Sequence, residues 1–274
     1  MLKYAGNKRK IMGSISPVFG SWTDVKRYVE PFCGALGSAL NAEVPLHVEI
    51  VLSDANRDLI ELYEEIVRDE DGLEVVANAL ATDEVSYYAI RAWDRDPLWP
   101  SNRTKQERAA RTLYLNKRGF NGLYRTNRQG YFTTPWCRNP TPRKIDVVGH
   151  SIFISFLKTR GLPLLSDWRH VIASCGEGDV VYCDPPYIDL KDPKRDFSGY
   201  LGVFGWKDQV ALRDELVAAN ARGARVIVSN SWCEATLELY AGWSQQSISA
   251  QRNLSAKAGS RGTISELLAW LPSV

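Results

Sequence analysis

The most informative stretch of the sequence is Val180-Val181-Tyr182-Cys183-Asp184-Pro185-Pro186-Tyr187. It consists of an apolar run followed directly by a polar turn that contains two prolines. Such a run is typical of a buried strand, and prolines end strands. Each proline fixes φ near about −65° and biases the preceding residue toward an extended conformation, so Asp184 and Tyr187 keep a defined separation. A planar amine could donate its two protons to the Asp184 carboxylate and the Pro185 carbonyl while its ring stacks on Tyr187. An ordinary strand-to-loop turn is the alternative.

Length and composition indicate a globular protein with a real core. The chain has 274 residues, of which 45% are hydrophobic, and this length suits one large domain or two smaller ones. Five cysteines and three histidines are scattered without close pairing, so neither a metal site nor a disulfide framework is indicated. Residues 1–10 lack the apolar core of a signal peptide, and no apolar run reaches the roughly 18 residues of a membrane span. We therefore expect a cytoplasmic protein without membrane contact.

The net charge of +2 conceals one strongly basic stretch, in which Glu107 is the only acid. A local basic surface attracts polyanions such as nucleic acids, although a solvated helix face is an equally good explanation of such a run. The basic residues are Arg103, Lys105, Arg108, Arg111, Lys117, Arg118, Arg125 and Arg128.

Two strand-and-turn segments lie in the first quarter of the chain. Residues 25–30 predict a short strand, followed by a glycine-bearing turn over 31–38 and a helix that opens near Ser38. Residues 47–52 predict a second strand, and Asp54 follows it about 20 residues after the glycines. In nucleotide-binding folds an acid at this place binds ribose hydroxyls; capping of a helix over 57–68 is the alternative.

The rest of the chain predicts an insertion within an α/β fold. Residues 57–118 have helical spacing, and residues 119–145 form an irregular basic and aromatic segment. Strands and helices resume after residue 150, with strands over 162–165, 180–183, 225–229 and 266–271 and a helix over 208–220. The prediction is one domain made of residues 1–56 and 146–274, interrupted by a mainly helical domain over 57–145.

Four stretches, in one order, resemble the Dam-type family of DNA adenine-N6 methyltransferases. They are residues 3–10 (KYAGNKRK), residues 30–34 (EPFCG) with 53–56 (SDAN), residues 115–132 (LNKRGFNGLYRTNRQGYF) and residues 184–187 (DPPY). The third stretch resembles the family's DNA-contacting loop almost residue for residue. The fold that this resemblance implies is a Rossmann-like, S-adenosylmethionine-dependent methyltransferase sheet with an inserted, mainly helical DNA-recognition domain.

The resemblance implies S-adenosylmethionine as the methyl donor. Asp54 is expected to hold the ribose hydroxyls, and Asp167-Trp168 resembles an acid-aromatic pair beside the cofactor adenine, although a helix cap and a core tryptophan explain that pair equally well. Two residues depart from the family pattern: Leu36 stands within the glycine turn, and Asn7 replaces a usual glycine. The residues expected at the cofactor are Tyr4, Lys8, Phe32, Gly34, Asp54, Asp167 and Trp168.

The resemblance also implies the reaction and its partner, double-stranded DNA. An adenine rotated out of the duplex would be methylated on N6, with Asp184, Pro185 and Tyr187 as the catalytic residues. The implied site is GATC, and no protein partner is indicated. The residues expected at DNA are Lys3, Arg118, Phe120, Asn121, Leu123, Arg125 and Arg128, among which Phe120 would fill the gap left by the flipped base and Arg118 and Arg128 would neutralise phosphates.

Other functions share part of this pattern. A cytosine-N4 methyltransferase also uses a proline turn to accept an exocyclic amine, but it more often carries serine at the position of Asp184. RNA and protein methyltransferases, and a catalytically weak DNA-binding relative, are further alternatives. The same chemistry serves solitary regulators, restriction-modification partners and phage-borne enzymes.

Overall fold

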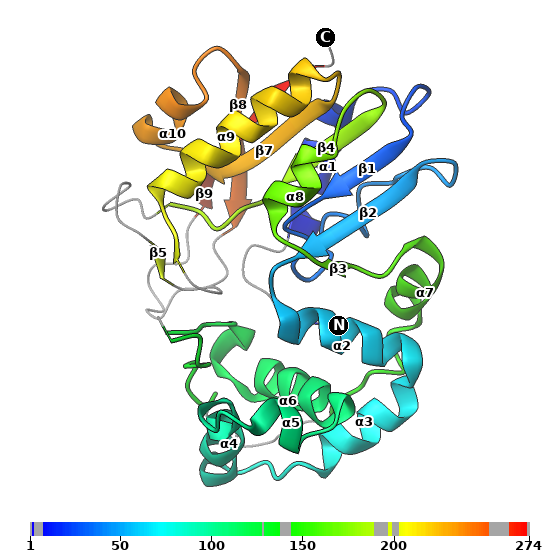
Figure 1. Ribbon diagram of the computed structural model, residues 1–274, viewed down its shortest axis with the longest axis vertical. Helices are drawn as coiled ribbons and strands as arrows, with labels where there is room; N and C mark the ends of the chain where they lie inside the picture. Colours follow the sequence, from blue (N-terminus) through cyan, green and yellow to red (C-terminus); the bar gives the residue numbers. More distant parts are fainter. Residues whose placement is uncertain are drawn as a thin grey trace. The chain divides into compact units, whose positions relative to one another are not determined.

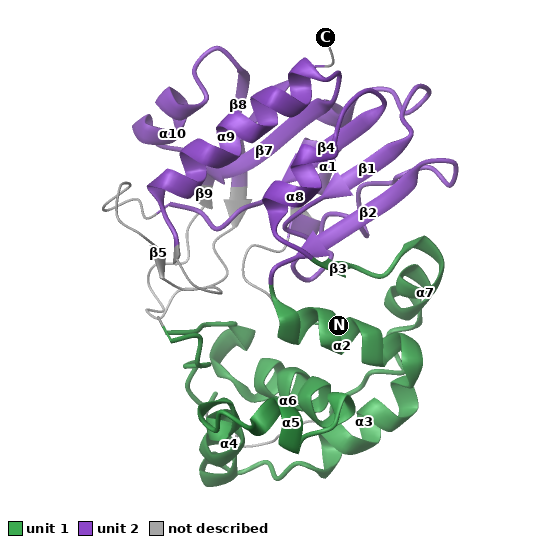
Figure 2. Cartoon of the chain, in the orientation of Figure 1, with its two compact units in different colours: residues 1–6, 56–165, 198–203 green, residues 7–55, 166–197, 204–274 purple. Residues whose placement is uncertain are grey.

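A computed structural model describes residues 2, 8–127, 129–137, 144–188, 197–198, 203–251 and 263–272. The chain divides into two compact units, which Figure 2 distinguishes by colour. Unit 1 comprises residues 1–6, 56–165 and 198–203, and unit 2 comprises residues 7–55, 166–197 and 204–274. Among the helices of the described ranges, none is both long and apolar enough to cross a membrane.

Unit 2 is built around strands that alternate with helices (Figure 1). In chain order its elements are η1 (Lys8–Lys10), α1 (Met12–Ile15), η2 (Ser16–Phe19), β1 (Arg27–Glu30), β2 (Glu49–Asp54), α8 (Trp168–Ala173), β4 (Asp179–Cys183), α9 (Trp206–Ala221), β7 (Arg225–Ser231), α10 (Glu234–Leu239), β8 (Ser244–Gln251) and β9 (Thr263–Leu271). The short strands β5 (Phe197–Ser198) and β6 (Val203–Phe204) pair with each other.

Unit 1 is mainly helical. Its elements are α2 (Arg57–Arg68), α3 (Glu70–Ala79), α4 (Glu84–Arg91), η3 (Ala92–Arg95), α5 (Trp99–Asn102), α6 (Lys105–Arg118), η4 (Phe120–Gly122), α7 (Ser151–Arg160) and the two-residue strand β3 (Leu164–Leu165). Polar caps fix several of these helices. The Asn56 side chain accepts from the Leu59 amide at the start of α2, and Thr104 and Glu107 form a capping box on α6.

Among the described residues, the main sheet has seven strands in the order β3-β2-β1-β4-β7-β9-β8. Strands β2, β1, β4 and β7 run parallel, whereas β9 is antiparallel to both β7 and β8. From β1 the chain continues to β2 on one side of it, and β4 pairs on the other side, so a topological switch point lies between β1 and β4. The Rossmann-like α/β fold predicted from the sequence is confirmed.

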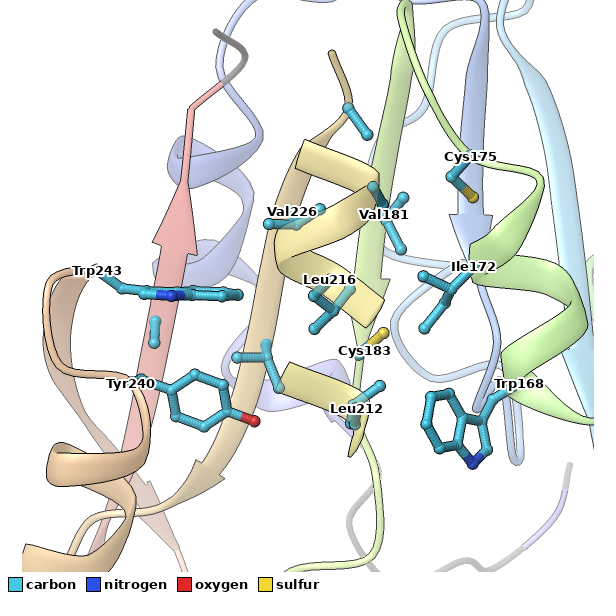
Figure 3. Packing of buried hydrophobic residues seen from close by; sticks show 14 of the residues in the cluster. Trp168, Ile172, Cys175, Val181, Cys183, Leu212, Leu216, Val226, Tyr240 and Trp243 are labelled. Atoms are coloured by element: carbon cyan, nitrogen blue, oxygen red, sulfur yellow. The ribbon is translucent and has the colours of Figure 1, made fainter. Parts of the chain in front are cut away.

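Both faces of the sheet in unit 2 are covered by apolar side chains. On one face, Leu212 and Leu216 of α9 and Ile172 of α8 pack with Val181 and Val226 of the strands (Figure 3). Each such buried aliphatic side chain contributes roughly 1.5–3 kcal/mol. The opposite face carries aromatic residues from η2 and the strands, because Phe19 makes edge contacts with Tyr28 and Tyr182, at 5.7 and 5.9 Å between ring centroids.

Most predicted elements form, among them the helix over 57–68. The helix expected to open near Ser38 is wrong, because residues 37–41 form turns. They directly follow Gly34 and Leu36, whose left-handed φ values of 46° and 62° no right-handed helix accommodates. Strand β8 was not predicted, since its polar sequence Ser244–Gln251 lacks an apolar alternation.

Candidate active site

Functional side chains of unit 2 gather where β1, β2 and β4 end. In open α/β sheets, ligands bind beyond the carboxyl ends of the strands at the switch point. Glu30 ends β1, Asp54 ends β2, and Asp184 follows β4 directly. The sheet topology thus brings the acids of β1 and β2 to the same edge as Asp184, which follows Glu30 by 154 positions in the chain.

The Asp184 carboxylate is held through one of its two oxygens. Ser229 Oγ of β7 donates to Asp184 Oδ1 at 2.8 Å, and Lys8 Nζ lies 3.1 Å from the same oxygen. Tyr182 OH contacts Ser229 Oγ at 3.2 Å and extends this network into the core. Within the described part of the chain, no residue donates a hydrogen bond to Oδ2. Burial raises the pKa of Asp184, against the lowering effect of Lys8 and Ser229.

The proline turn after Asp184 is fixed from behind by α9 and β7. Gln209 of α9 is fully buried and donates to the Pro186 carbonyl at 2.8 Å, and Asn230 of β7 donates to Gln209 Oε1 at 2.9 Å. Pro185 is buried as well. A turn held this firmly keeps Asp184 and Tyr187 in place before any substrate arrives.

Lys8 links three residues of the site. Its ammonium lies 2.7 Å from Tyr187 OH, 3.1 Å from Glu266 Oε2 and 4.4 Å from the centre of the Tyr187 ring, in addition to its ion pair with Asp184. Burial alone would lower the pKa of Lys8, but Asp184 and Glu266 outweigh this effect, so the pKa lies above its ordinary value. Lys8 was predicted at the cofactor; the structure places its ammonium beside Asp184 and Tyr187. Glu266 was not predicted at all.

The glycine turn after β1 is tied to Asp54. The Gly34 amide donates to Asp54 Oδ2 at 2.9 Å, and the left-handed φ of 46° at Gly34 suits a residue without a Cβ. Leu36 also has a left-handed φ, 62°, although its side chain is fully buried. A buried leucine in this conformation is strained, so packing of its side chain must hold the turn against that strain.

Glu30 is a buried acid beside this turn. Its carboxyl accepts from Tyr28 OH at 2.9 Å and from Ser38 Oγ. Burial raises the pKa of Glu30 to about 8, against the lowering effect of these two donors, and Asp184 and Asp54 raise it further. The three carboxyl groups are therefore close enough to influence one another, and a cation entering among them would be stabilised.

Three aromatic rings lie together near the end of β1. Phe32 lies 6.1 Å from Trp168 and 5.8 Å from Phe204, and Trp168 lies 6.3 Å from Phe204, between ring centroids. Phe32 and Phe204 are partly exposed, whereas Trp168 is 6% exposed and belongs to the hydrophobic core of unit 2. Asp167 is exposed, and its side chain accepts from the Arg169 amide as the cap of α8. Phe204 was not predicted, because it lies outside the four motifs on which the expected site rests.

In unit 1, the described residues of the segment 119–137, which are 119–127 and 129–137, form a hairpin-like loop. Isolated bridges join Gly119 to Trp136 and Thr126 to Phe132, and Thr134 Oγ1 donates to the Leu123 carbonyl at 2.7 Å. Of the predicted DNA-contacting residues, Arg125 is exposed and Phe120 and Asn121 are partly exposed, whereas Leu123 and Arg118 are each 8% exposed. Lys3, Arg128 and the predicted cofactor residue Tyr4 lie outside the described residues.

Side chains of α4 and η3 anchor this loop, and sequence analysis did not identify them. Asp94 Oδ2 accepts from the Phe132 amide at 2.7 Å, Arg95 donates to the Phe132 carbonyl at 2.6 Å, and Arg91 donates to the Thr133 carbonyl at 3.1 Å. Asp94 also pairs with the buried Arg111 at 3.0 Å. Their only sequence signal is a run of charges before a proline, which is typical of many helix ends.

Much of the predicted basic surface is neutralised. Arg108 pairs with Glu61 of α2 at 2.9 Å, Lys105 pairs with Glu64 of α2, and Arg103 pairs with Glu107 at 3.3 Å. The sequence stretch contains a single acid, but the fold supplies others from α2. This run therefore contributes less positive surface than its composition indicates.

A family model and the curated relatives all point to one family of methyltransferases. A family model described as D12 class N6 adenine-specific DNA methyltransferase matches residues 4–254. Type II methyltransferase M1.LlaDCHI of Lactococcus lactis subsp. cremoris is 32% identical, over 97% of this chain and 93% of that protein. The Retron Ec67 DNA adenine methylase of Escherichia coli is 31% identical, over 98% of this chain and 90% of that protein.

Two further similarities are more limited. The DNA N-6-adenine-methyltransferase of Escherichia phage P1 is 32% identical over 99% of this chain, which covers 35% of that longer protein. Among solved structures, the rRNA methyltransferase aviRa of Streptomyces viridochromogenes has a TM-score of 0.34 and 12% identity, over 96% of this chain and 83% of that one.

Proposed function

The chain belongs to the D12 class of N6 adenine-specific DNA methyltransferases, and on that premise we propose that it methylates adenine in GATC after rotating that base out of the duplex. The observation that carries this proposal is the Asp184 carboxylate: Oδ1 is held by Ser229 and Lys8, and Oδ2 faces no donor among the described residues. An exocyclic amine is a donor of the kind that this oxygen lacks.

Membership of this family, together with the fold, implies S-adenosylmethionine as the cofactor. The residues of unit 2 suit this cofactor. We assign the cofactor adenine to the rings of Phe32 and Trp168 and the ribose hydroxyls to Asp54, whose hydrogen bond to Gly34 fixes its orientation. When bound, this cofactor supplies a methyl group on a cationic sulfonium. The carboxylates of Asp54 and Asp184 make these surroundings negative, which favours a cation, whereas Glu30 with its pKa of about 8 is largely protonated near pH 7.

In this proposal Asp184 and Pro185 orient the target nitrogen. Asp184 Oδ2 and the Pro185 carbonyl each accept a hydrogen bond from one N6–H group. These two hydrogen bonds turn the nitrogen lone pair out of conjugation with the purine ring. Asp184 then holds the proton that N6 releases when it is methylated. Tyr187 stacks on the flipped base, whose extraction costs a few kcal/mol that stacking and hydrogen bonds offset.

The loop of residues 119–137 supplies sequence specificity in this proposal. The exposed Arg125 guanidinium can donate two bonds to guanine O6 and N7, a contact worth about 1–3 kcal/mol of discrimination. Asn121 and Leu123 contact neighbouring bases, and Phe120 fills the gap in the stack. Asn121 adopts φ 56°, which asparagine tolerates better than most residues and which sets the direction of the loop. Because Arg118 is buried, we assign it to packing of α6 rather than to phosphate.

The experiment that tests this function uses two duplexes that differ only in GATC against GTTC. The purified protein is incubated with methyl-labelled S-adenosylmethionine, and the labelled nucleoside is identified after digestion. N6-methyladenine on the first duplex alone supports the proposal. Equal labelling of both duplexes contradicts the site, and label on cytosine contradicts the assignment of the target base.

A further inference from the structure

We propose that Glu266 is a positioning residue for methyl transfer, acting on the catalytic turn through Lys8 and Tyr187. This inference rests on the proposed function of Asp184 and Tyr187. Glu266 lies on β9, the antiparallel strand, opposite Ser231 of β7, and it is 8% exposed. It lies 79 residues after Tyr187 in the sequence, outside every motif that led to the site.

One oxygen of Glu266 receives two donors. Glu266 Oε2 lies 3.1 Å from Lys8 Nζ and accepts from Tyr187 OH at 2.9 Å. Lys8 Nζ in turn lies 2.7 Å from Tyr187 OH, so the three groups form a closed set of contacts. Burial holds the pKa of Tyr187 well above its ordinary value, so the phenol keeps the proton that it donates to Glu266.

Glu266 influences Asp184 through the charge of Lys8, which contacts both carboxylates. The Lys8 ammonium lies 3.1 Å from Asp184 Oδ1 and 3.1 Å from Glu266 Oε2, so its charge is shared between two carboxylates. If Glu266 were neutral, the ammonium would be paired with Asp184 alone, and that pair would tighten because both groups are largely buried. A carboxylate more strongly engaged by Lys8 is a weaker acceptor for the target amine.

Glu266 also orients the ring of Tyr187. Tyr187 is the ring on which the flipped base stacks in the proposed function, and its hydroxyl is oriented by Glu266. Loss of this acceptor leaves a largely enclosed hydroxyl with a weaker partner and frees the ring to turn. Glu266 therefore fixes both the charge that acts on Asp184 and the plane of the stacking ring, without touching the reacting atoms.

The test compares Glu266→Gln and Glu266→Ala with the wild-type protein. We expect the single-turnover rate constant, at saturating cofactor and DNA, to fall about tenfold or more in Glu266→Ala, with dissociation constants for S-adenosylmethionine and DNA changed less than about threefold. Glu266→Gln keeps an acceptor for Tyr187, so it should recover part of the rate. Ser265→Ala, at an exposed neighbour on the same strand, is the matched control and should behave as wild type.

A double-mutant cycle with Lys8→Met tests the route of the effect. If Glu266 acts through Lys8, Glu266→Gln should cost much less rate in the Lys8→Met background than in the wild type. Equal costs in the two backgrounds contradict action through Lys8. An unchanged rate constant in both Glu266 variants, or a loss confined to thermal stability and cofactor affinity, makes Glu266 a structural residue and overturns the proposal.

The substrate for these measurements is genomic DNA free of N6-methyladenine, so that the result does not depend on the recognition site. If the wild type methylates such DNA at sites other than GATC, the specificity proposal fails. The comparison of the Glu266 variants with wild type still tests the positioning role of Glu266. If the wild type transfers no methyl group to any DNA, the proposed function fails, and the role of Glu266 in it fails too.

Discussion

At the scale of single residues, the two oxygens of Asp184 have different surroundings. Oδ1 receives Ser229 and Lys8, which compensate the cost of placing a charge in a largely buried position. Oδ2 faces no donor from the described residues and remains available to a substrate. A carboxylate held by one oxygen and free at the other is pre-organised for an amine, since binding requires no rearrangement of its protein partners.

Glu30 should make the stability of the protein depend on pH. Its folded pKa of about 8 lies above the ordinary value of 4.5, so its contribution to stability is fully present below about pH 4.5 and is lost as pH rises through about 8. In Glu30→Gln this dependence should be absent. We therefore expect the free energy of unfolding of the wild type to decrease, relative to Glu30→Gln, by roughly a few kcal/mol between pH 5 and pH 8.

Thermal or denaturant unfolding of both proteins at several pH values measures this difference. Asp58, whose pKa is also raised by burial, does not interact with Glu30, so its contribution is the same in both proteins and cancels in the comparison. A constant difference between the two proteins across this pH range would contradict the raised pKa of Glu30.

Leu36 should stabilise the glycine turn despite its strained backbone. Replacement by glycine relieves roughly 1–2 kcal/mol of left-handed strain, but it removes a fully buried side chain worth roughly 2–5 kcal/mol. We expect Leu36→Gly to be less stable than wild type by roughly 1–3 kcal/mol, as measured by urea unfolding.

Glu43→Gly is the matched control for this substitution. Glu43 also has a left-handed φ, 52°, but its side chain is exposed, so glycine should be neutral or slightly stabilising there. If Leu36→Gly were as stable as wild type, the backbone strain would equal the packing contribution of Leu36, and a more stable variant would mean that the strain outweighs it.

At the scale of elements, the proline turn after Asp184 is supported by two strands and a helix that are distant in sequence. Gln209 of α9 and Asn230 of β7 fix the proline turn after β4, Ser229 of β7 fixes the acid, and Glu266 of β9 reaches the tyrosine. Sheet order produces this convergence, because β7 and β9 follow β4 in the sheet. The geometry of the candidate site therefore depends on the sheet rather than on the motif alone.

The loop of residues 119–137 is the element on which specificity should depend. Its backbone is anchored by Asp94, Arg95 and Arg91, and Arg125 projects from it as an exposed cation. We expect Arg125→Ala to reduce discrimination between GATC and a duplex with its guanine substituted by roughly 1–3 kcal/mol, which is about 5- to 150-fold in relative kcat/KM.

Arg103→Ala removes the same charge from unit 1 at a residue that pairs with Glu107, and it serves as the control. It should leave the discrimination ratio unchanged. If Arg125→Ala lowered activity on both duplexes by the same factor, Arg125 would contact phosphate rather than guanine.

At the scale of the whole molecule, local patterns predicted the fold well. Apolar runs bounded by turn residues predicted β1, β2, β4 and β7, and apolar spacing predicted α2 and α9, because these elements bury one or both faces in the core. The order of the strands in the sheet, the pairing of β8 and the turns over residues 34–42 depend on contacts between distant segments. No local pattern contains that information.

The same distinction holds for the candidate site. Asp184, Tyr187, Asp54 and Phe32 belong to compact motifs and could be predicted, whereas Glu266, Ser229 and Gln209 have ordinary strand and helix surroundings in the sequence. Arg108 is the opposite case, a residue for which the local sequence led to a misleading prediction. It was predicted as part of a basic surface, but α2 provides Glu61 as its partner.

Asp184 is proposed to activate adenine N6 within GATC, and one experiment in cells tests the residue and the site together. Wild type and Asp184→Ala are expressed in a host without N6-methyladenine, and modified bases in the recovered plasmid are mapped by native long-read sequencing. We expect N6-methyladenine at GATC sites with wild type and none with Asp184→Ala, although the purified variant still binds DNA and S-adenosylmethionine. Methylation by Asp184→Ala at the wild-type level would remove Asp184 from the proposed mechanism, and modification of an unrelated sequence would reject GATC as the site.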